Sequence, residues 1–418
     1  MASICVYEGE RHKDLLPICW MRPVFDLRCG INTLLEKVRR EYPRVNTYIF
    51  CRDYLVDTVR GKYPGTIINK MGKETSILFL DGSVLFDKDL AKLIPTNGPD
   101  ELFECDGRIV AARLSKDNLE SLKSKINGAV TADLLSDFKG AVRVTAVKAR
   151  IINFYFDLIR ENGEEIGRDF SSKTKGGLIK GRLHQTSVLS PKGRIFIDDG
   201  SNIGAFAVLD AKDGPIYIGR GVTVHPHSLI EGPAYIGDHS AVLGGKIRKN
   251  TSIGPHSRIG GEVSGTIFQG YVNKQHYGFL GHSYIGEWVN FGAGTTTSNM
   301  KNNYGSIRIK YIDQETDSKQ MFFGAAIADH VKFGIGTLIN SGSVFGVAGN
   351  MFGGGIMPKF VSSFAWGGSS GFEVHDVEKA IKTAGAVMKR RGIELTEAEA
   401  ILFRKIFELT GTERSHLK

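Results

Sequence analysis

The second half of the sequence carries a six-residue period of hydrophobic side chains. The positions are Ile218, Val224, Ile230, Ile236 and Val242, then Ile247, Ile253 and Ile259, then Ile285 and Phe291, and finally Ile327, Phe333, Ile339, Phe345 and Met351. This period fits neither a helix nor a simple strand. It is typical of a parallel β-helix, in which each hexapeptide forms one side of a coil and points one apolar residue inward. Known coils of this type are left-handed, against the usual crossover rule. We therefore predict a left-handed parallel β-helix over residues 186–371.

Glycine content supports these limits. Of the 51 glycines, 33 fall between Gln185 and Phe372, and glycine suits the tight corners of such a coil. Two segments, 268–280 and 295–321, carry polar residues where an inward apolar residue is due. Insertions in solenoids leave the coil as loops, often on the binding face. We expect both segments to be loops of this kind.

The first part of the chain has a different pattern. The stretches SICVYEG, NTYIFC and SILFLDG look like short buried strands, and TLLEKVRREY and KDNLESLKSKI look like helices. Alternation of this kind predicts an α/β domain with a mainly parallel sheet, over residues 1–160. Residues 161–185 are polar and rich in Gly and Lys, which predicts a linker. Residues 372–418 predict C-terminal helices, the second opened by the capping box TEAE.

The net charge and the cysteine content indicate which ligands and which cellular compartment to expect. The chain of 418 residues has 54 Lys and Arg against 45 Asp and Glu, a net charge of +9. Without a nucleic-acid motif, this charge favours small phosphorylated metabolites over nucleic acid. Five cysteines without a CxxC pair indicate reduced thiols in a cytoplasmic protein. Neither a signal peptide nor a membrane span is expected.

The stretch VNKQHYGFLGHSYIGEWVNFGAGTTTSN contains the candidate chemistry. A coil has no structural need for His276, whose imidazole could act as a general base near neutral pH. The amides of Asn290 and Asn299 could orient a polar substrate. From the residues alone, the alternative stays open that His276 is a surface histidine and that the asparagines cap turns.

This stretch resembles the acetyltransferase half of the bifunctional enzyme family that makes UDP-N-acetylglucosamine. In that family a histidine precedes an LG…IG…NVNIGAGT…N run, which corresponds here to His276, LG, IG and WVNFGAGTTTSN. A divergent branch of the family, described as sugar nucleotidyltransferases, is also similar in IGPHSRIGGEVSGTIFQGYVNKQH and SNMKNNY. The resemblance covers most of the chain. It implies an N-terminal nucleotidyltransferase domain joined to a left-handed β-helix.

Carried over residue by residue, the resemblance makes His276 the general base and Asn290 and Asn299 sugar-site residues. Ala293 would present the backbone to the acetyl group, and Ala325 and Ser341 would line the site of the co-substrate acetyl-CoA. Phe279 stands where the family has a tyrosine, and Ser264 where it has a lysine. A phosphate clamp must therefore come from other residues of the substrate site, for which the candidates are Arg258, Lys274 and Lys301.

The N-terminal domain departs further from the family. The Gly-rich loop that cradles phosphates is missing after the first strand, although RPVFDLRCGINTLLEKV and LFLDGSVLF resemble later family motifs. Ser83 stands where the family has its magnesium-binding aspartate, with Asp81 and Gly82 displaced before it. Because magnesium needs carboxylate oxygens in defined places, magnesium catalysis here is disfavoured. Arg22 and Arg28 could still bind a nucleotide phosphate.

Three functions compete. The first is a homotrimeric transferase that acetylates an amino-sugar phosphate, in nucleotide-sugar synthesis, and whose N-terminal domain acts as a sugar-1-phosphate nucleotidyltransferase. The second is a scaffold or regulatory protein that binds a nucleotide sugar. The third is a β-helix metalloenzyme, which needs three converging histidines. It has candidates in His225, His227, His239, His256, His276 and His282 but lacks the close-set pair of that family, so we rank it last.

Overall fold

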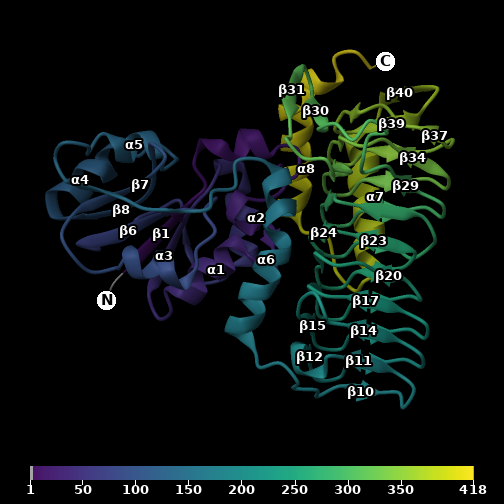
Figure 1. Cartoon of the computed structure of the whole chain (residues 1–418). Helices are drawn as coiled ribbons and strands as arrows, with labels where there is room; N and C mark the ends of the chain where they lie inside the picture. Colours follow the sequence, from purple (N-terminus) through teal and green to yellow (C-terminus); the bar gives the residue numbers. More distant parts are fainter. Residues whose placement is uncertain (1–2, 418) are drawn as a thin grey trace. The chain divides into compact units, whose positions relative to one another are not determined.

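The computed structural model describes residues 3–417, which divide into two compact units. The first comprises the chain up to Leu27 together with Asn32–Phe154, and the second comprises Arg28–Ile31 and the chain from Tyr155 onward. We describe each unit by itself. Figure 1 labels the elements along the chain.

The first unit is an α/β domain built on one seven-stranded sheet of order β5-β4-β1-β6-β8-β7-β9. Strands β1, β4, β5 and β6 are parallel, and β8 pairs antiparallel with β6 and β7. The strands are β1 (Ser3–Tyr7), β4 (Asn46–Phe50), β5 (Ile67–Ile68), β6 (Ser76–Asp81), β7 (Glu101–Cys105), β8 (Arg108–Ser115) and β9 (Arg143–Ala146). The three strands predicted from the sequence are β1, β4 and β6, so the α/β prediction is confirmed.

Helices connect these strands. They are α1 (Leu34–Glu41), α2 (Val56–Lys62), α3 (Lys88–Leu93), α4 (Lys116–Lys125) and α5 (Ala132–Ser136). A capping box between Thr33 and Glu36 starts α1, where two backbone donors are satisfied reciprocally. Chain order runs outward from β1 through β4 to β5 and then returns to β6 on the other side of β1. The carboxyl ends of β1 and β6 thus form a topological switch point, where open α/β sheets bind ligands.

The second unit is a parallel β-helix with three faces, which we call A, B and C (Figure 1). Face A contains β10 (Arg182–Leu183), β13 (Asn202–Ile203), β16 (Thr223–Val224), β19 (Ala241–Val242), β22 (Arg258–Ile259), β25 (Asn273–Lys274), β28 (Asn290–Phe291), β33 (Lys332–Phe333), β36 (Asn350–Met351) and β39 (Ala365–Gly368), with β40 (Gly371–Val374) added antiparallel. Face B contains β11 (Val188–Ser190), β14 (Val208–Asp210), β17 (Leu229–Glu231), β20 (Lys246–Ile247), β23 (Glu262–Ser264) and β26 (Phe279–Gly281), followed by β29 (Thr296–Thr297), β34 (Thr337–Ile339) and β37 (Gly355–Ile356). Face C contains β12 (Ile195–Ile197), β15 (Ile216–Ile218), β18 (Ala234–Ile236), β21 (Thr251–Ile253), β24 (Ile267–Phe268), β27 (Tyr284–Ile285), β32 (Ala325–Ile327), β35 (Ser343–Phe345) and β38 (Phe360–Val361).

The inward positions of the coils confirm the six-residue period. All fifteen hydrophobic residues of the period, from Ile218 to Met351, belong to one buried core cluster. Each buried aliphatic side chain of this size contributes about 1.5–3 kcal/mol. The β-helix prediction is therefore confirmed by the strands and by the core.

The two predicted insertions have different outcomes. Residues 295–321 do leave the coil after β29 and form a hairpin of β30 (Arg308–Tyr311) and β31 (Gln314–Asp317). Residues 268–280 do not leave it, since β24, β25 and β26 pair in register with the coil below. The prediction of a loop there is wrong, because Lys274 occupies the inward position that an aliphatic residue fills elsewhere.

Helices complete the second unit. They are α6 (Tyr155–Lys173), α7 (Val377–Lys389) and α8 (Glu397–Leu409), the last with the predicted capping box at Thr396 and Glu399. Helix α6 occupies half of the segment predicted as a linker. Its polar residues Asn162 and Asp169 are buried and accept the backbone N–H groups of Gly30 and Ile31, at 2.8 and 2.9 Å. They satisfy the backbone of the turn that follows β2 (Arg28–Cys29), so the linker prediction does not hold for this stretch.

Candidate functional site

His276 lies at the corner that joins face A to face B, between β25 and β26. Its side chain is exposed and has no hydrogen-bond partner among residues 3–417. One coil further on, Ala293 occupies the next corner of the same row. The two corners are joined by a hydrogen bond in which the Gly294 N–H donates to the Tyr277 carbonyl, at 3.1 Å. His276, whose imidazole forms no hydrogen bond within residues 3–417, therefore lies one coil before Ala293 in the same row of corners.

The Ala293 peptide is oriented by its neighbours. Its carbonyl accepts the N–H of Gly336 at 2.8 Å, and the adjacent N–H groups of Gly292 and Gly294 donate to Phe333 and Tyr277. Within the described residues, the N–H of Ala293 itself donates to no acceptor. Within the described residues, these two neighbouring corners therefore carry one free backbone donor and one free imidazole. Such a pair can remove a proton and stabilise an oxyanion.

Asn290 lies on face A, next to Asn273 of the preceding coil. The side-chain Nδ2 of Asn273 donates to Oδ1 of Asn290 at 2.7 Å. The side-chain Nε2 of Gln275 donates to Oδ1 of Asn273 at 2.6 Å. This chain of amides leads from Asn290 to the residue directly before His276. The same amides line a cleft of about 380 Å³ between face A and α7, and the predicted Arg258 lines it too.

Asn299 lies at a different corner, where face B meets face C. Its amide nitrogen lies 2.8 Å from Nδ1 of His282, whose pKa is lowered by burial. Phe279 lies over the same spot, since a Cβ on Gly281 would stand 2.5 Å from Phe279 Cζ and 2.6 Å from Asn299 Nδ2. The structure therefore brings Asn299 and Phe279 together but places them at the opposite edge of face B from His276. Sequence reasoning weighed His282 only as a metal ligand and missed this contact.

The predicted acetyl-CoA positions Ala325 and Ser341 lie on consecutive coils. The N–H of Gly342 donates to the carbonyl of Gly324 at 2.7 Å, which joins the two stretches. Ala325, however, is completely buried in the β-helix core. Its side chain points inward with Ile327, so only its backbone could face a co-substrate.

The side chains of Lys274 and Lys301 both donate hydrogen bonds to backbone carbonyls of the protein. The Nζ of Lys274 donates to the carbonyls of Gly260, His276 and Gly278, at 3.0, 3.2 and 2.7 Å, and the side chain is 2 % exposed. The structure thus corrects its assignment as a surface phosphate ligand. Lys274 instead holds the corner that carries His276. Lys301 donates to Ser306 within the inserted segment at 2.6 Å.

We expect the buried Lys274 to make the free energy of unfolding of the β-helix depend on pH. Burial lowers the pKa of Lys274 from its ordinary 10.5 to about 8. Between these values the unfolded chain binds the proton and the folded chain does not, so folded stability rises with pH. The free energy of unfolding of the wild type should therefore gain up to about 3 kcal/mol relative to Lys274→Met between pH 8 and 10.5. Denaturant titrations at several pH values measure this difference.

The exposed Lys246 on face B provides the control. Lys246→Met removes an exposed lysine in place of a buried one, so a change of pH profile that is confined to Lys274→Met can be attributed to burial. Parallel profiles for Lys274→Met and the wild type would contradict the assignment of a buried, pH-sensitive lysine.

In the first unit, a cleft of about 410 Å³ lies at the carboxyl ends of β1 and β6. Residues after β1, including Arg11 and Lys13, contribute to its wall, as do Asp81 at the end of β6 and Arg108 at the start of β8. Carboxylates of Glu10, Asp14 and Asp133 also line it, so its charge is mixed. A 3-10 helix (Glu10–Leu15) replaces the Gly-rich loop that the family has after the first strand. The cleft coincides with the switch point of the sheet.

Asp81 is already fully engaged by protein groups. Its Oδ1 accepts from the N–H and hydroxyl of Ser83, at 2.9 and 2.7 Å, and its Oδ2 forms an ion pair with Arg108. Gly82 is required by packing, since a Cβ there would meet Phe25 and the Tyr7 carbonyl at 2.9 Å. These residues do not fit a magnesium ion, because both carboxylate oxygens face donors. Arg108 is the residue that sequence reasoning missed.

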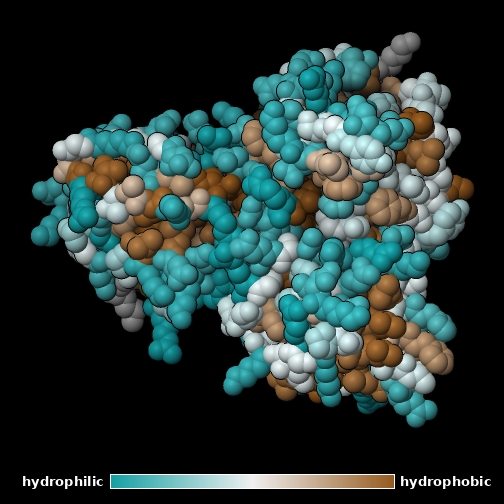
Figure 2. All heavy atoms as spheres, viewed as in Figure 1, coloured by the Kyte–Doolittle hydropathy of each residue, from teal (hydrophilic) through white to brown (hydrophobic). Residues whose placement is uncertain are grey.

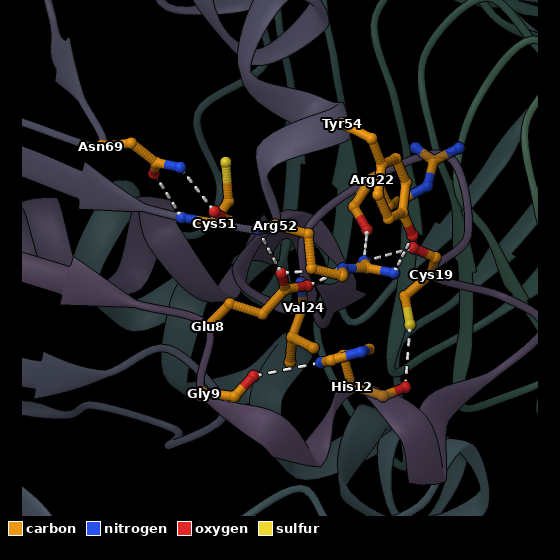
Figure 3. A network of polar contacts seen from close by, with 10 residues as sticks. All are labelled: Glu8, Gly9, His12, Cys19, Arg22, Val24, Cys51, Arg52, Tyr54 and Asn69. Atoms are coloured by element: carbon orange, nitrogen blue, oxygen red, sulfur yellow. Dashed lines mark hydrogen bonds and ion pairs between the residues drawn. The ribbon is translucent and has the colours of Figure 1, made fainter. Parts of the chain in front are cut away.

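The two arginines predicted to bind nucleotide lie elsewhere. Arg22 is 6 % exposed, belongs to the polar network of Figure 3, and is not one of the residues that line the cleft. Arg28 belongs to the second unit, where its N–H donates to Gln269 and Tyr284, at 3.1 and 3.0 Å. Both assignments are corrected, because long-range folding buries these side chains.

Within residues 3–417, no three His, Cys, Asp or Glu side chains are grouped closely enough to hold a metal ion. No helix in the described part of the chain is both long and apolar enough to cross a membrane.

Comparison with known proteins agrees with this two-part organisation. A family model described as sugar nucleotidyl transferase matches residues 4–177. The bifunctional protein GlmU of Wigglesworthia glossinidia brevipalpis is 35% identical over 117 residues, which are 26% of this chain and 23% of that protein. The chain thus spans about a quarter of the length of the first relatives that it matches. GlmU of Methanococcus vannielii is 25% identical over 392 residues, with 81% of this chain and 89% of that protein covered.

Among solved structures, the Francisella novicida UDP-N-acetylglucosamine acyltransferase matches 56% of this chain and 87% of its own, at 14% identity and a TM-score of 0.33. That likeness is too weak to bear on this chain. Over most of its length the chain is similar to the bifunctional GlmU proteins, at low sequence identity.

Proposed function

We propose that the chain is a transferase of nucleotide-sugar synthesis whose β-helix moves an acetyl group from acetyl-CoA to the amine of an amino-sugar phosphate. The observation that carries this proposal is that His276 and Ala293 lie at neighbouring corners of one row, and that within residues 3–417 neither the imidazole nor the Ala293 N–H has a hydrogen-bond partner. The match to GlmU relatives along the chain supports it.

The chemistry needs only these groups and the two substrates. The acceptor amine attacks the thioester carbonyl while the imidazole of His276 takes up its proton. The Ala293 N–H stabilises the oxyanion that forms. The C–S bond then breaks, leaving an N-acetyl sugar and the CoA thiolate, which is protonated. The amides at Asn290 and Asn273 would hold the acceptor.

We include a homotrimer in the proposal. His276 and Asn290 lie at one edge of the coil, and Asn299, Phe279 and Ser341 lie at another, so one copy cannot bring both sets to a single substrate. A neighbouring copy can supply the second set. Exposed apolar side chains that such a copy could cover are Tyr277, Ile335, Leu338, Phe352 and Ile356. Figure 2 shows apolar residues in brown over the β-helix.

We also propose a cytoplasmic location. All five cysteines are free and buried. Buried reduced thiols of this kind suit a reducing compartment.

The test of acetyl transfer is an incubation of the full chain with acetyl-CoA and a panel of amino-sugar phosphates, followed by detection of free thiol. Thiol release that depends on one acceptor, and that matches the acetylated sugar formed, supports the proposal. Thiol release without an acceptor measures background hydrolysis. If no amino-sugar phosphate is acetylated, the β-helix acts as a scaffold and the binding-protein function replaces this one.

For the N-terminal unit we propose binding of a nucleotide or sugar phosphate without efficient magnesium catalysis. The supporting observation is the ion pair between Asp81 and Arg108, which occupies the carboxylate that a metal would need. We therefore expect slow or undetectable pyrophosphate release from UTP or dTTP with a sugar 1-phosphate and magnesium, while ligand binding remains measurable. A coupled pyrophosphate assay and calorimetry give the two readouts. Rapid, magnesium-dependent release would refute this part of the proposal.

A further inference from the structure

Four cationic side chains converge on the cleft between face A and α7, which we call the arginine cleft. Arg258 extends from β22 and Lys332 from β33, while Arg390 and Arg391 follow the last turn of α7. The lining of the cleft contains no Asp or Glu. Its cations therefore come from three separate elements, and no carboxylate within the lining balances them.

The three arginines lack ion pairs of their own. Among residues 3–417, the side chains of Arg258, Arg390 and Arg391 form no salt bridge or hydrogen bond. Burial, followed by the charges of Arg258 and Arg390, lowers the pKa of Arg391. Burial also lowers the pKa of Lys332, to about 7, and its Nζ donates to the Trp288 carbonyl. Gathering like charges costs free energy that a bound anion would offset.

The helix dipole is a simpler explanation for cations at the end of α7, but it explains only some of the basic residues of the cleft. Cations near a helix C-terminus interact favourably with its dipole, which would account for Lys389 and Arg390. It does not account for Arg258 and Lys332, which come from the coil, nor for the absence of carboxylates. A ligand explains all four.

The neutral part of the lining suits a polar ring compound. The side chains of Asn273, Gln275 and Asn290 form a chain of amides that can exchange hydrogen bonds with hydroxyl groups. Tyr271 and Trp288 also line the cleft and stack with ring centroids 4.2 Å apart. At about 380 Å³ the cleft lies within the range of small-molecule sites.

We propose that the arginine cleft binds the phosphate of a small phosphorylated ligand, with Arg258, Arg390 and Arg391 as its ligands. Guanidinium groups recognise phosphate through paired, charge-assisted hydrogen bonds. Gln275 precedes His276 directly, so a ligand held here reaches toward the candidate base. The identity of that ligand as the acceptor sugar phosphate rests on the proposed acetyl transfer. The phosphates of acetyl-CoA are the other source of the same chemistry.

The test is calorimetric binding to the full chain, without acyl transfer, of inorganic phosphate, an amino-sugar 1-phosphate, the unphosphorylated amino sugar and CoA. Arg390→Gln with Arg391→Gln should weaken binding of the sugar phosphate roughly tenfold or more for each arginine. The matched control removes two exposed cations of α7 outside the cleft, as Lys382→Gln with Lys389→Gln. It should leave the affinity unchanged. Arg258→Gln repeats the test from the coil side if the helix variant fails to fold.

Each outcome has a defined meaning. A loss confined to the cleft variants and to phosphorylated ligands supports the proposal, and the arm that responds, sugar phosphate or CoA, identifies the source. Equal losses in the cleft variant and the control, or none in either, overturn it. His276→Ala should retain binding. Binding without any acetyl transfer would remove the proposed function while leaving this inference standing.

Discussion

Replacing His276 by alanine is expected to lower kcat for acetyl transfer by about 10²–10⁴-fold, the usual worth of general-base catalysis. A protonated amine has no lone pair with which to attack the thioester, so removal of its proton is part of the chemical step. The imidazole is exposed at the corner and forms no hydrogen bond, ion pair or ring contact within residues 3–417. The free energy of unfolding should therefore change little, within the range of other surface substitutions.

The control for this experiment is His225→Ala. His225 is also exposed and lies at the same row of corners, after β16, three coils before His276. It is far from Ala293 along the coil, so its loss should leave kcat unchanged. Binding of the acceptor should be similar in all three proteins, since the expected effect is on the chemical step. Comparable turnover in His276→Ala would show that His276 is only a corner histidine.

The sequence predicted the fold well because the coil repeats one local rule. An apolar residue every six positions has a single architectural meaning, and the series from Ile218 to Val242 satisfies it without a gap. The prediction of a loop at residues 268–280 failed because a polar residue there occupies an inward position while the backbone stays in the coil. Lys274 keeps its place in β25 and turns its ammonium to three carbonyls. A polar residue at an inward position is therefore poor evidence that the chain leaves the coil.

The candidate site was predicted only as far as local motifs reach. The run from His276 to Asn299 is contiguous, so the family motif could be carried onto it residue by residue without a gap. Arg390 and Arg391 lie almost a hundred residues beyond that run, and only the packing of α7 brings them to Asn290. In the same way, polar residues such as Asn162 and Asp169 made the sequence of α6 look like a linker. Their buried partners at Gly30 and Ile31 are more than a hundred residues away.

A second large effect is expected at Arg52, in the polar network shown in Figure 3. Its guanidinium donates to both carboxylate oxygens of Glu8, at 2.8 and 2.9 Å, and to the carbonyls of Cys19 and Arg22, at 2.7 and 2.8 Å. Glu8 also accepts the Val24 N–H at 2.9 Å. The two charged side chains are only 11 and 2 % exposed. The network thus joins the end of β1 to the segment before β2 (Arg28–Cys29).

Arg52→Met should lower the free energy of unfolding by about 3–5 kcal/mol, because it leaves the buried Glu8 carboxylate without its cation. Denaturant unfolding measures this loss. Glu8→Leu combined with Arg52→Met should lose less than the sum of the single changes, since no charge then remains unpaired. The control is Arg60→Met, which breaks the exposed pair with Asp57 and should cost about 0–1 kcal/mol. Because Gly9 and Glu10 follow Glu8 directly and line the first unit's cleft, Arg52→Met should also weaken ligand binding there. An Arg52→Met protein as stable as Arg60→Met would show that the network does not hold this end of the sheet.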